Sequence, residues 1–181
     1  WSVMIYRQSE INTAGYIDQV SFYVNNAVSN VVMINQKIFM QNTSDTVTYG
    51  NTVYPSLAPS MQLVYNGILN WTGPGWVTIM LNTPFYYDNV NSLMIYCENH
   101  QGAYQTPYPT FSCSSAYARS GYINLTNNFP NNAGYSVDRR IDIMLSFLPS
   151  TSNNMQALNG LIEGDVASPG QFNIYSSFRN T

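Results

Sequence analysis

Apolar and polar residues alternate with a period of two along most of this chain, and helical periodicity is nearly absent. Successive side chains of a β-strand point to opposite faces, so this alternation predicts strands with one buried face. The predicted inward sets are Val20/Phe22/Val24, Val32/Ile34/Ile38/Met40, Val77/Ile79/Leu81, Leu93/Ile95/Cys97 and Ile141/Ile143/Leu145/Phe147. Many short strands separated by turn residues predict an all-β fold, a two-sheet antiparallel β-sandwich of jelly-roll type.

Turn-forming residues separate the predicted strands. Asn66-Gly67 lies between Met61–Tyr65 and Ile68–Trp71, and this pair favours the positive φ angles of a tight turn. We therefore expect a β-hairpin there. Gly73-Pro74-Gly75 should break the chain before a strand that begins at Trp76, whose side chain we expect in the core.

With 181 residues, the chain is long enough for one sizeable core. A stretch rich in Pro, Ser and Asn occupies 149–154, and strand-like segments follow at 158–166 and 172–175. We therefore predict one β-sandwich binding module over 1–148, and a linker with extra strands over 149–181. The second segment is either a tail or the truncated start of an immunoglobulin-like module.

Charge is scarce in this chain. Charged residues make up 8% of it, and the net charge is −3. Lys37 and the scattered arginines form no basic stripe that could neutralise phosphates, so we expect no nucleic-acid partner. Polar residues or glycine interrupt every apolar segment before it reaches the roughly 18 residues that a membrane-spanning helix needs, so we expect no membrane insertion.

A series of short segments follows the order and spacing of a known family. The segments are Ile5-Tyr6, Ser9–Ile11, Thr13–Gly15, Val20–Tyr23, Leu63–Gly67, Gly75–Ile79, Leu81–Phe85, Tyr87-Asp88, Asn91–Ile95 and Arg139–Ile143. Together they resemble the secreted β-sandwich modules of Bacteroidota surface proteins, a group similar to the cleaved-adhesin domains that accompany gingipain-type proteases. The resemblance covers residues 1–148.

This resemblance implies a non-catalytic, extracellular adhesive or carbohydrate-binding module that is secreted or displayed at the cell surface after type IX secretion. The partner would be a glycan or a surface protein. The alternative is a structural subunit of a surface fibre, filament or layer, in which residues 150–181 join a neighbouring subunit by strand exchange.

Catalytic groups are few, and we assign none. The sole histidine, His100, follows Cys97 by three residues, and side chains three apart on a strand point to opposite faces. A glycosidase would need two carboxylates on opposing elements. The candidates are Asp88, Glu98, Asp138 and Asp142, although each also suits a turn cap or an outward strand position. We therefore do not expect an enzyme.

The loop of residues 98–111 is the most suggestive segment for binding. Aromatic faces stack on the apolar surfaces of sugars, while amides and carboxylates hydrogen-bond to the hydroxyls. The candidate ligand-binding residues of this loop are Glu98, Asn99, His100, Tyr104, Tyr108 and Phe111. Trp71 and Tyr86 are second candidates. The same residues also suit a self-packed loop that covers a sheet edge.

Cys97 and Cys113 lie sixteen residues apart across this loop. In an exported chain they are candidates for a disulfide, which would stabilise the fold by roughly 3 kcal/mol. The alternative is two reduced cysteines, because Cys97 shares an apolar face with Leu93 and Ile95.

Oxygen-bearing side chains also suggest a metal and modification sites. Asp88, Asn89 and Asn91 offer ligands for a structural calcium ion, which the resembling domains often carry, although a plain Asx turn explains the same residues. The N-glycosylation pattern begins at Asn42, Asn70 and Asn124.

Overall fold

The computed structural model describes residues 1–102, 106–123 and 128–149. Strands dominate these residues, and the helices are short. The strands are β1 (Ser2–Tyr6), β2 (Gly15–Val24), β3 (Val31–Thr43), β4 (Gln62–Trp71), β5 (Gly75–Tyr87), β6 (Ser92–Asn99), β7 (Cys113–Tyr122), β8 (Tyr135–Ile141) and β9 (Ile143–Phe147). The helices are α1 (Gln8–Ile11), α2 (Tyr54–Leu57) and the 3-10 helix η1 (Ala58–Ser60).

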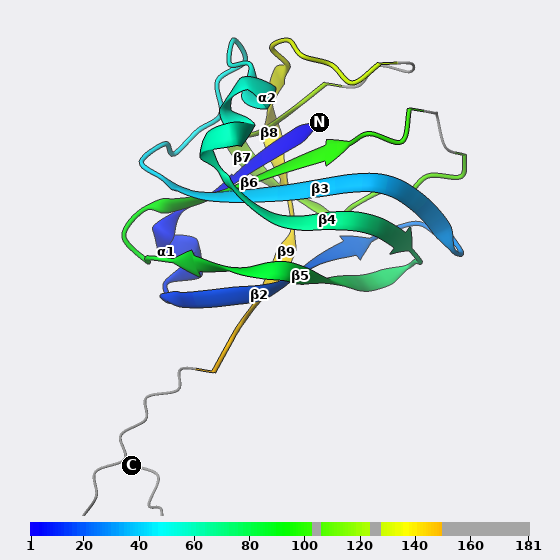
Figure 1. Cartoon of the computed structure of the whole chain (residues 1–181), viewed down its shortest axis with the longest axis horizontal. Helices are drawn as coiled ribbons and strands as arrows, with labels where there is room; N and C mark the ends of the chain where they lie inside the picture. The colour runs from blue at the N-terminus through cyan, green and yellow to red at the C-terminus, as the bar shows by residue number, and fades with distance from the viewer. Residues whose placement is uncertain (103–105, 124–127, 150–181) are drawn as a thin grey trace, which may run out of the picture. The chain divides into compact units, whose positions relative to one another are not determined.

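The strands form two antiparallel sheets. Sheet A has six strands in the order β4-β3-β6-β1-β7-β8, and sheet B has three in the order β5-β2-β9. Figure 1 shows β2 and β5 lying below β3 and β4, with α2 on the opposite side of sheet A. The all-β, two-sheet antiparallel prediction is therefore confirmed, whereas the jelly-roll connectivity stays a prediction.

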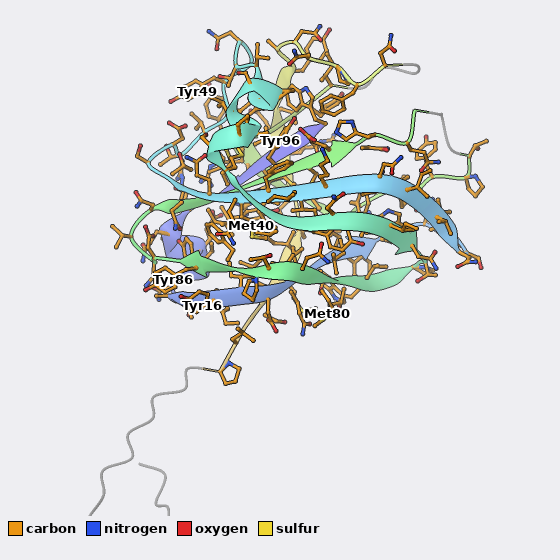
Figure 2. The ribbon with its side chains drawn as sticks, in the orientation of Figure 1. Tyr16, Met40, Tyr49, Met80, Tyr86 and Tyr96 are labelled. Atoms are coloured by element: carbon orange, nitrogen blue, oxygen red, sulfur yellow. The ribbon has the colours of Figure 1, made fainter. Side chains whose placement is uncertain are left out.

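The main hydrophobic core lies between the two sheets. Val20, Phe22 and Val24 of β2 point into it, and Leu93 and Ile95 of β6 meet them from sheet A. Met40 lies between the sheets in Figure 2. The alternation therefore assigned the inward faces of β2 and β6 correctly.

A second core covers the outer face of sheet A. Trp1, Met94 and Tyr96 pack there with Tyr54 of α2 and Ala58 of η1. The ring centroids of Trp1 and Tyr54 lie 5.4 Å apart. Sheet A is therefore buried on both faces over much of its area, whereas alternation predicted only one buried face.

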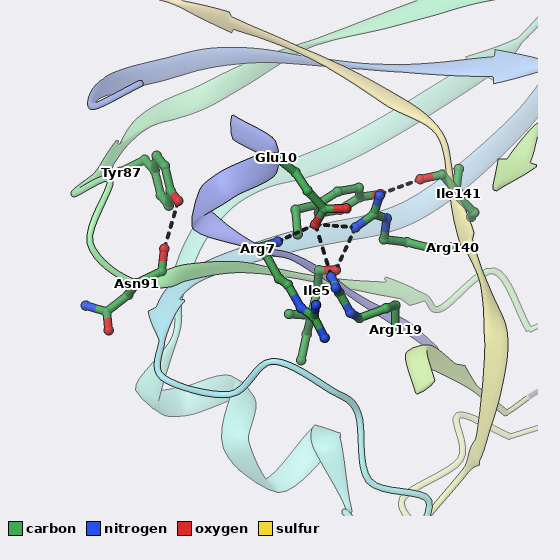
Figure 3. A network of polar contacts seen from close by, with 9 residues as sticks. Ile5, Arg7, Glu10, Tyr87, Asn91, Arg119, Arg140 and Ile141 are labelled. Atoms are coloured by element: carbon green, nitrogen blue, oxygen red, sulfur yellow. Dashed lines mark hydrogen bonds and ion pairs between the residues drawn. The ribbon is translucent and has the colours of Figure 1, made fainter. Parts of the chain in front are cut away.

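A charged cluster ties α1 to two strands of sheet A (Figure 3). One carboxylate oxygen of Glu10 accepts hydrogen bonds from Arg119 at 3.0 Å and from Arg140 at 2.7 Å. The same oxygen accepts the backbone N–H of Arg7 at 2.6 Å. Because α1 joins β1 to β2, this cluster fixes the connection between the two sheets.

Strand β3 corrects one predicted inward set. Ile38 and Met40 are buried, but Val32 and Ile34 are exposed. The β3–β4 register shifts between Met33 and Gln36. A bulge of this kind moves the side chains that follow it to the other face of the sheet, so the four residues cannot share one face.

The predicted hairpin at Asn66-Gly67 is wrong, because β4 runs through this pair as a single strand. Both residues pair with β3, with Asn66 opposite Lys37 and Gly67 opposite Gln36.

The predicted strand over 141–147 is two strands in different sheets, since β8 ends at Ile141 and β9 begins at Ile143.

The prediction that Trp76 lies in the core is wrong, because Trp76 is exposed on the outer side of β5, where its ring meets Tyr23 with centroids 5.3 Å apart.

Residues Trp1 to Leu148 form one compact unit. The predicted linker and extra strands cover 149–181, of which 150–181 lie outside the described residues, and they stay a prediction. None of the helices among the described residues has the length and apolar character required to span a membrane.

Candidate functional site

A cavity at one end of the sandwich has a volume of about 540 Å³, within the range of about 300–1,000 Å³ typical of ligand pockets. Its apolar wall comes from both sheets, including Met4 and Ile38 of sheet A and Phe22 and Ile79 of sheet B. Six strands span about 29 Å and three span about 14 Å. Sheet B is therefore too narrow to cover the whole inner face of sheet A, which leaves room for a cavity.

Most of the predicted ligand-binding residues line this one cavity. Those that do are Trp71, Glu98, Asn99, His100, Tyr108 and Phe111. Tyr104 lies outside the described residues. Tyr86 is not at the cavity, because it points away from it on the outer face of sheet B and contacts Tyr16.

Aromatic rings form one side of the cavity. Phe111 meets Trp71 and Phe22 edge-on, with ring centroids 4.9 Å and 6.0 Å away. Asn26 holds the adjacent loop, because its amide nitrogen donates to the Tyr108 carbonyl at 2.9 Å and its oxygen accepts the Thr110 N–H at 2.8 Å. Loop residues from far along the chain are thereby fixed against the end of β2.

A buried carboxylate forms the polar part of the site. Glu98 is 6% exposed, and one of its oxygens lies 2.7 Å from Nε2 of His100 and 3.7 Å from Nζ of Lys37. The His100 ring stacks on Phe129 with centroids 4.1 Å apart. Burial, together with the nearby Glu98 carboxylate, raises the pKa of Tyr96. The carboxylate is therefore held in place by the Lys37 ammonium and by the His100 ring, which itself packs on Phe129.

Amide groups line the cavity on the other face of sheet A, because Asn99 follows Glu98 on β6 and successive side chains of a strand point to opposite faces. Nε2 of Gln36 donates to Oδ1 of Asn99 at 2.7 Å and to the Ile34 carbonyl at 2.7 Å. Oδ1 of Asn99 also accepts the Gln101 N–H at 3.0 Å. Gln36 and Asn99 are brought together by the pairing of β3 with β6.

Sequence reasoning missed several lining residues. They are Trp1, Gln36, Lys37, Tyr122 and Phe129. Gln36 and Lys37 lie opposite Asn99 and Glu98 in the β3–β6 register, which joins segments more than sixty residues apart. Period-two alternation marks each strand but not its partner, so no local signal could have identified them.

The predicted Cys97–Cys113 disulfide is wrong, because both cysteines are free. Cys97 lies on β6 and Cys113 on β7, with β1 between these strands. Two inter-strand spacings separate the chains by about 9.5 Å. A disulfide requires Cα atoms within about 7 Å, so the sheet order itself prevents the bridge.

The two thiols should differ in reactivity. Burial raises the pKa of both thiols, but that of Cys97 rises to about 12 while Cys113 is exposed, and only the thiolate reacts. Alkylation of the folded protein should therefore label Cys113 alone, and alkylation after unfolding should label both. Peptide mass spectrometry would locate the labels, and labelling of Cys97 in the folded protein would contradict the burial argument.

The expected calcium ligands form an Asx turn in this structure. Oδ1 of Asp88 accepts the N–H groups of Val90 at 2.8 Å and Asn91 at 2.9 Å, and Oδ2 accepts the Asn91 side chain at 2.7 Å. Oδ1 of Asn89 accepts from Gln8. Among the described residues, no group of three or more His, Cys, Asp or Glu side chains could hold a metal ion. A calcium role stays a prediction.

Two of the predicted glycosylation sites donate hydrogen bonds in the folded chain. The amide nitrogen of Asn42 donates to the Tyr86 carbonyl at 3.0 Å, and that of Asn70 donates to Oδ1 of Asn30 at 2.6 Å. A glycan would attach at this same nitrogen and would replace one of its two hydrogen atoms. Asn124 lies outside the described residues.

The four carboxylates considered for catalysis make different contacts and do not gather at one site. Asp138 accepts the Ala118 N–H, and Asp142 accepts the hydroxyls of Ser112 and Ser114. Of the four candidate carboxylates, only Glu98 lines the cavity. The arrangement can bind a polar ligand through rings, amides and one carboxylate.

Comparison with known proteins finds no matching family model, no significantly similar curated protein and no significantly similar solved structure.

Proposed function

We propose that this chain is a non-catalytic carbohydrate-binding module and that the cavity beside β6 holds a neutral glycan. The observation that supports this proposal most is the convergence of aromatic and amide residues on one cavity of about 540 Å³. Trp71, Phe111 and Tyr108 provide ring surface, and Asn99 and Gln36 provide amides. Such a mixture suits a ligand with apolar faces and hydroxyl groups.

The charge of the cavity favours a neutral ligand. Lys37 and His100 both face the Glu98 carboxylate, so the Lys37 ammonium already has an anionic partner. A strongly anionic ligand would compete with Glu98 for them, and a cationic ligand would meet Lys37. An uncharged sugar avoids both costs.

Two buried donors add to this support. The indole N–H groups of Trp1 and Trp71 have no hydrogen-bond partner among the described residues, and both tryptophans line the cavity. An unsatisfied buried donor is unfavourable, so a ligand that offers an oxygen acceptor to one of these rings gains free energy. The two rings lie on opposite faces of sheet A, Trp71 in the main core and Trp1 in the second, so each donor would need its own acceptor. Because both nitrogen atoms are themselves buried, each ring must shift slightly to reach the ligand.

Secretion by the type IX system and a place at the cell surface stay predictions from the family resemblance. The alternative function as a fibre or layer subunit assembled by strand exchange depends on residues 150–181, which lie outside the described residues, and it too stays a prediction.

The proposal predicts a specific loss of binding in Tyr108→Ala. A stacked ring contributes about 0.5–1.5 kcal/mol beyond its buried area, so the dissociation constant should rise severalfold or more. The wild type would first be screened on a glycan array and on insoluble neutral polysaccharides. The best ligand would then be titrated into both proteins by calorimetry.

Tyr117→Ala is the matched control, because Tyr117 is a more exposed tyrosine that does not line the cavity. Its affinity should equal that of the wild type, and circular dichroism should show all three proteins folded. A wild type that binds no neutral glycan would refute the proposed function. Equal binding by wild type and Tyr108→Ala would show that the glycan binds elsewhere.

A further inference from the structure

The outer face of sheet B is an aromatic surface. The residues that point outward from its three strands are Tyr16, Tyr23, Trp76, Met80, Tyr86 and Met144. We call this set the outer face of sheet B. Tyr16 lies directly opposite Tyr86, and Tyr23 lies opposite Trp76. One aromatic pair therefore lies at each end of the face.

This face is uncovered among the described residues. Its members Tyr16, Trp76, Met80, Tyr86 and Met144 are between 45% and 59% exposed. Figure 2 shows Tyr16, Tyr86 and Met80 on the side of sheet B that faces away from sheet A. The outer face of sheet A differs over β1 and β6, because α2, η1 and a second core cover it there. An exposed group of large apolar side chains on one face of a sheet is often an interaction site.

The composition of the face is that of a protein interface. Asp18 is the one charged residue in β2, β5 and β9. Tyr, Trp and Met are enriched at the buried centres of protein interfaces, and charged residues are depleted there. The two methionines lie between the aromatic pairs, and their flexible apolar side chains suit packing against other side chains better than stacking on a sugar ring.

We propose that the outer face of sheet B packs against the same face of a second copy of this chain. Two sheets that pack face to face lie about 10 Å apart with their side chains interdigitated. Such packing needs a second bare apolar sheet face, and the outer face of sheet B in another copy of this chain is such a face. A two-fold axis through this face supplies the partner, because it brings each residue set against itself.

Charge and area both permit this dimer. Without a lysine or arginine in sheet B, two facing copies meet no repulsion between cations, and Asp18 adds only one acidic group per copy. A fully exposed large side chain presents about 200 Å², so five half-exposed ones supply about 500 Å². The polar residues between them bring the face toward the roughly 800 Å² per partner of a standard interface. The dimer does not depend on the proposed function, and it would present two cavities in one particle.

Sedimentation of the full chain tests the dimer. The wild type should sediment as a dimer, with a weight-average mass that rises toward twice the chain mass as concentration increases. Met80→Asp places a charge at the centre of the face, and it should reduce the protein to a monomer at every concentration. Tyr117→Asp places the same charge on β7, outside the face, and should leave the dimer intact.

Each outcome decides the proposal. A monomeric wild type would overturn it, and so would a dimer that persists in Met80→Asp or one that Tyr117→Asp also dissociates. Circular dichroism would establish that both variants are folded, and Trp76→Ser offers a second, uncharged variant with the same expected loss of dimer. A monomeric wild type whose retention on insoluble polysaccharide is lost in Met80→Asp would assign the face to a glycan instead.

Discussion

Replacing Ile95 with alanine should lower the free energy of unfolding by about 2–5 kcal/mol, because it removes a fully buried side chain and leaves a cavity. Ile95 lies on β6, between Met40 of β3 and Met4 of β1, so neighbouring strands hold the walls of that cavity apart. Proteins of this kind are stable by only about 5–15 kcal/mol in total. Urea unfolding followed by tryptophan fluorescence would measure the loss.

Ile68→Ala is the matched control, because Ile68 is 61% exposed on β4. Removing the same atoms there should change the unfolding free energy by about 0.5 kcal/mol or less. The melting temperature of Ile95→Ala should fall by roughly 2–4 °C for each kcal/mol lost. Similar losses in the two variants would show that Ile95 is not at the centre of the core.

The second large effect concerns the Glu10 cluster. Glu10→Gln should lower the free energy of unfolding at neutral pH by about 1–3 kcal/mol, since buried Arg119 would keep its charge and lose its carboxylate. The Glu10 side chain is 36% exposed, so solvent screening keeps the effect below that of a fully buried pair. Urea unfolding of both proteins at pH 7 would measure this difference.

The same cluster should make the wild type sensitive to acid. Burial alone would raise the pKa of Glu10, but hydrogen bonds from Arg140 and from the Arg7 backbone lower it from 4.5 to about 2. The unfolded chain then binds more protons than the folded one as the pH falls. The stabilisation is therefore present above pH 4.5 and is lost between there and about pH 2.

Glu10→Gln lacks this titration, so its stability should approach that of the wild type as the pH falls to 2. Asp45→Asn removes the same charge outside the cluster, and it should reproduce neither the loss at pH 7 nor the convergence in acid. A constant difference between wild type and Glu10→Gln from pH 7 to pH 2 would contradict the assigned role of Glu10.

Part of the fold could be predicted from single segments. Val20, Phe22 and Val24 point into the main core as their alternation indicates, and so do Leu93 and Ile95. Alternation is a property of the extended backbone itself, because successive side chains of any strand face opposite ways. It therefore identifies strands and their inward residues without knowledge of the partner strand.

The failures arise where pairing with distant segments decides the conformation. Asn66-Gly67 has the local chemistry of a hairpin turn, yet both residues pair with β3 inside a continuous strand. Val32 and Ile34 are exposed because of a bulge in the β3–β4 pairing. The free energy of a sheet is shared over many cross-strand contacts, which together outweigh the preference of one dipeptide or one residue.

The same division applies to the candidate site. By itself, the sequence determined the all-β character and the inward residues of β2 and β6, and it identified the aromatic and amide character of loop 98–111. Only the tertiary structure decided that this loop meets Trp71, that Gln36 and Lys37 lie opposite Asn99 and Glu98, and that β1 separates Cys97 from Cys113. The physical reason is that side-chain chemistry and alternation are local, whereas strand order and register depend on burying the apolar faces of all the strands at once.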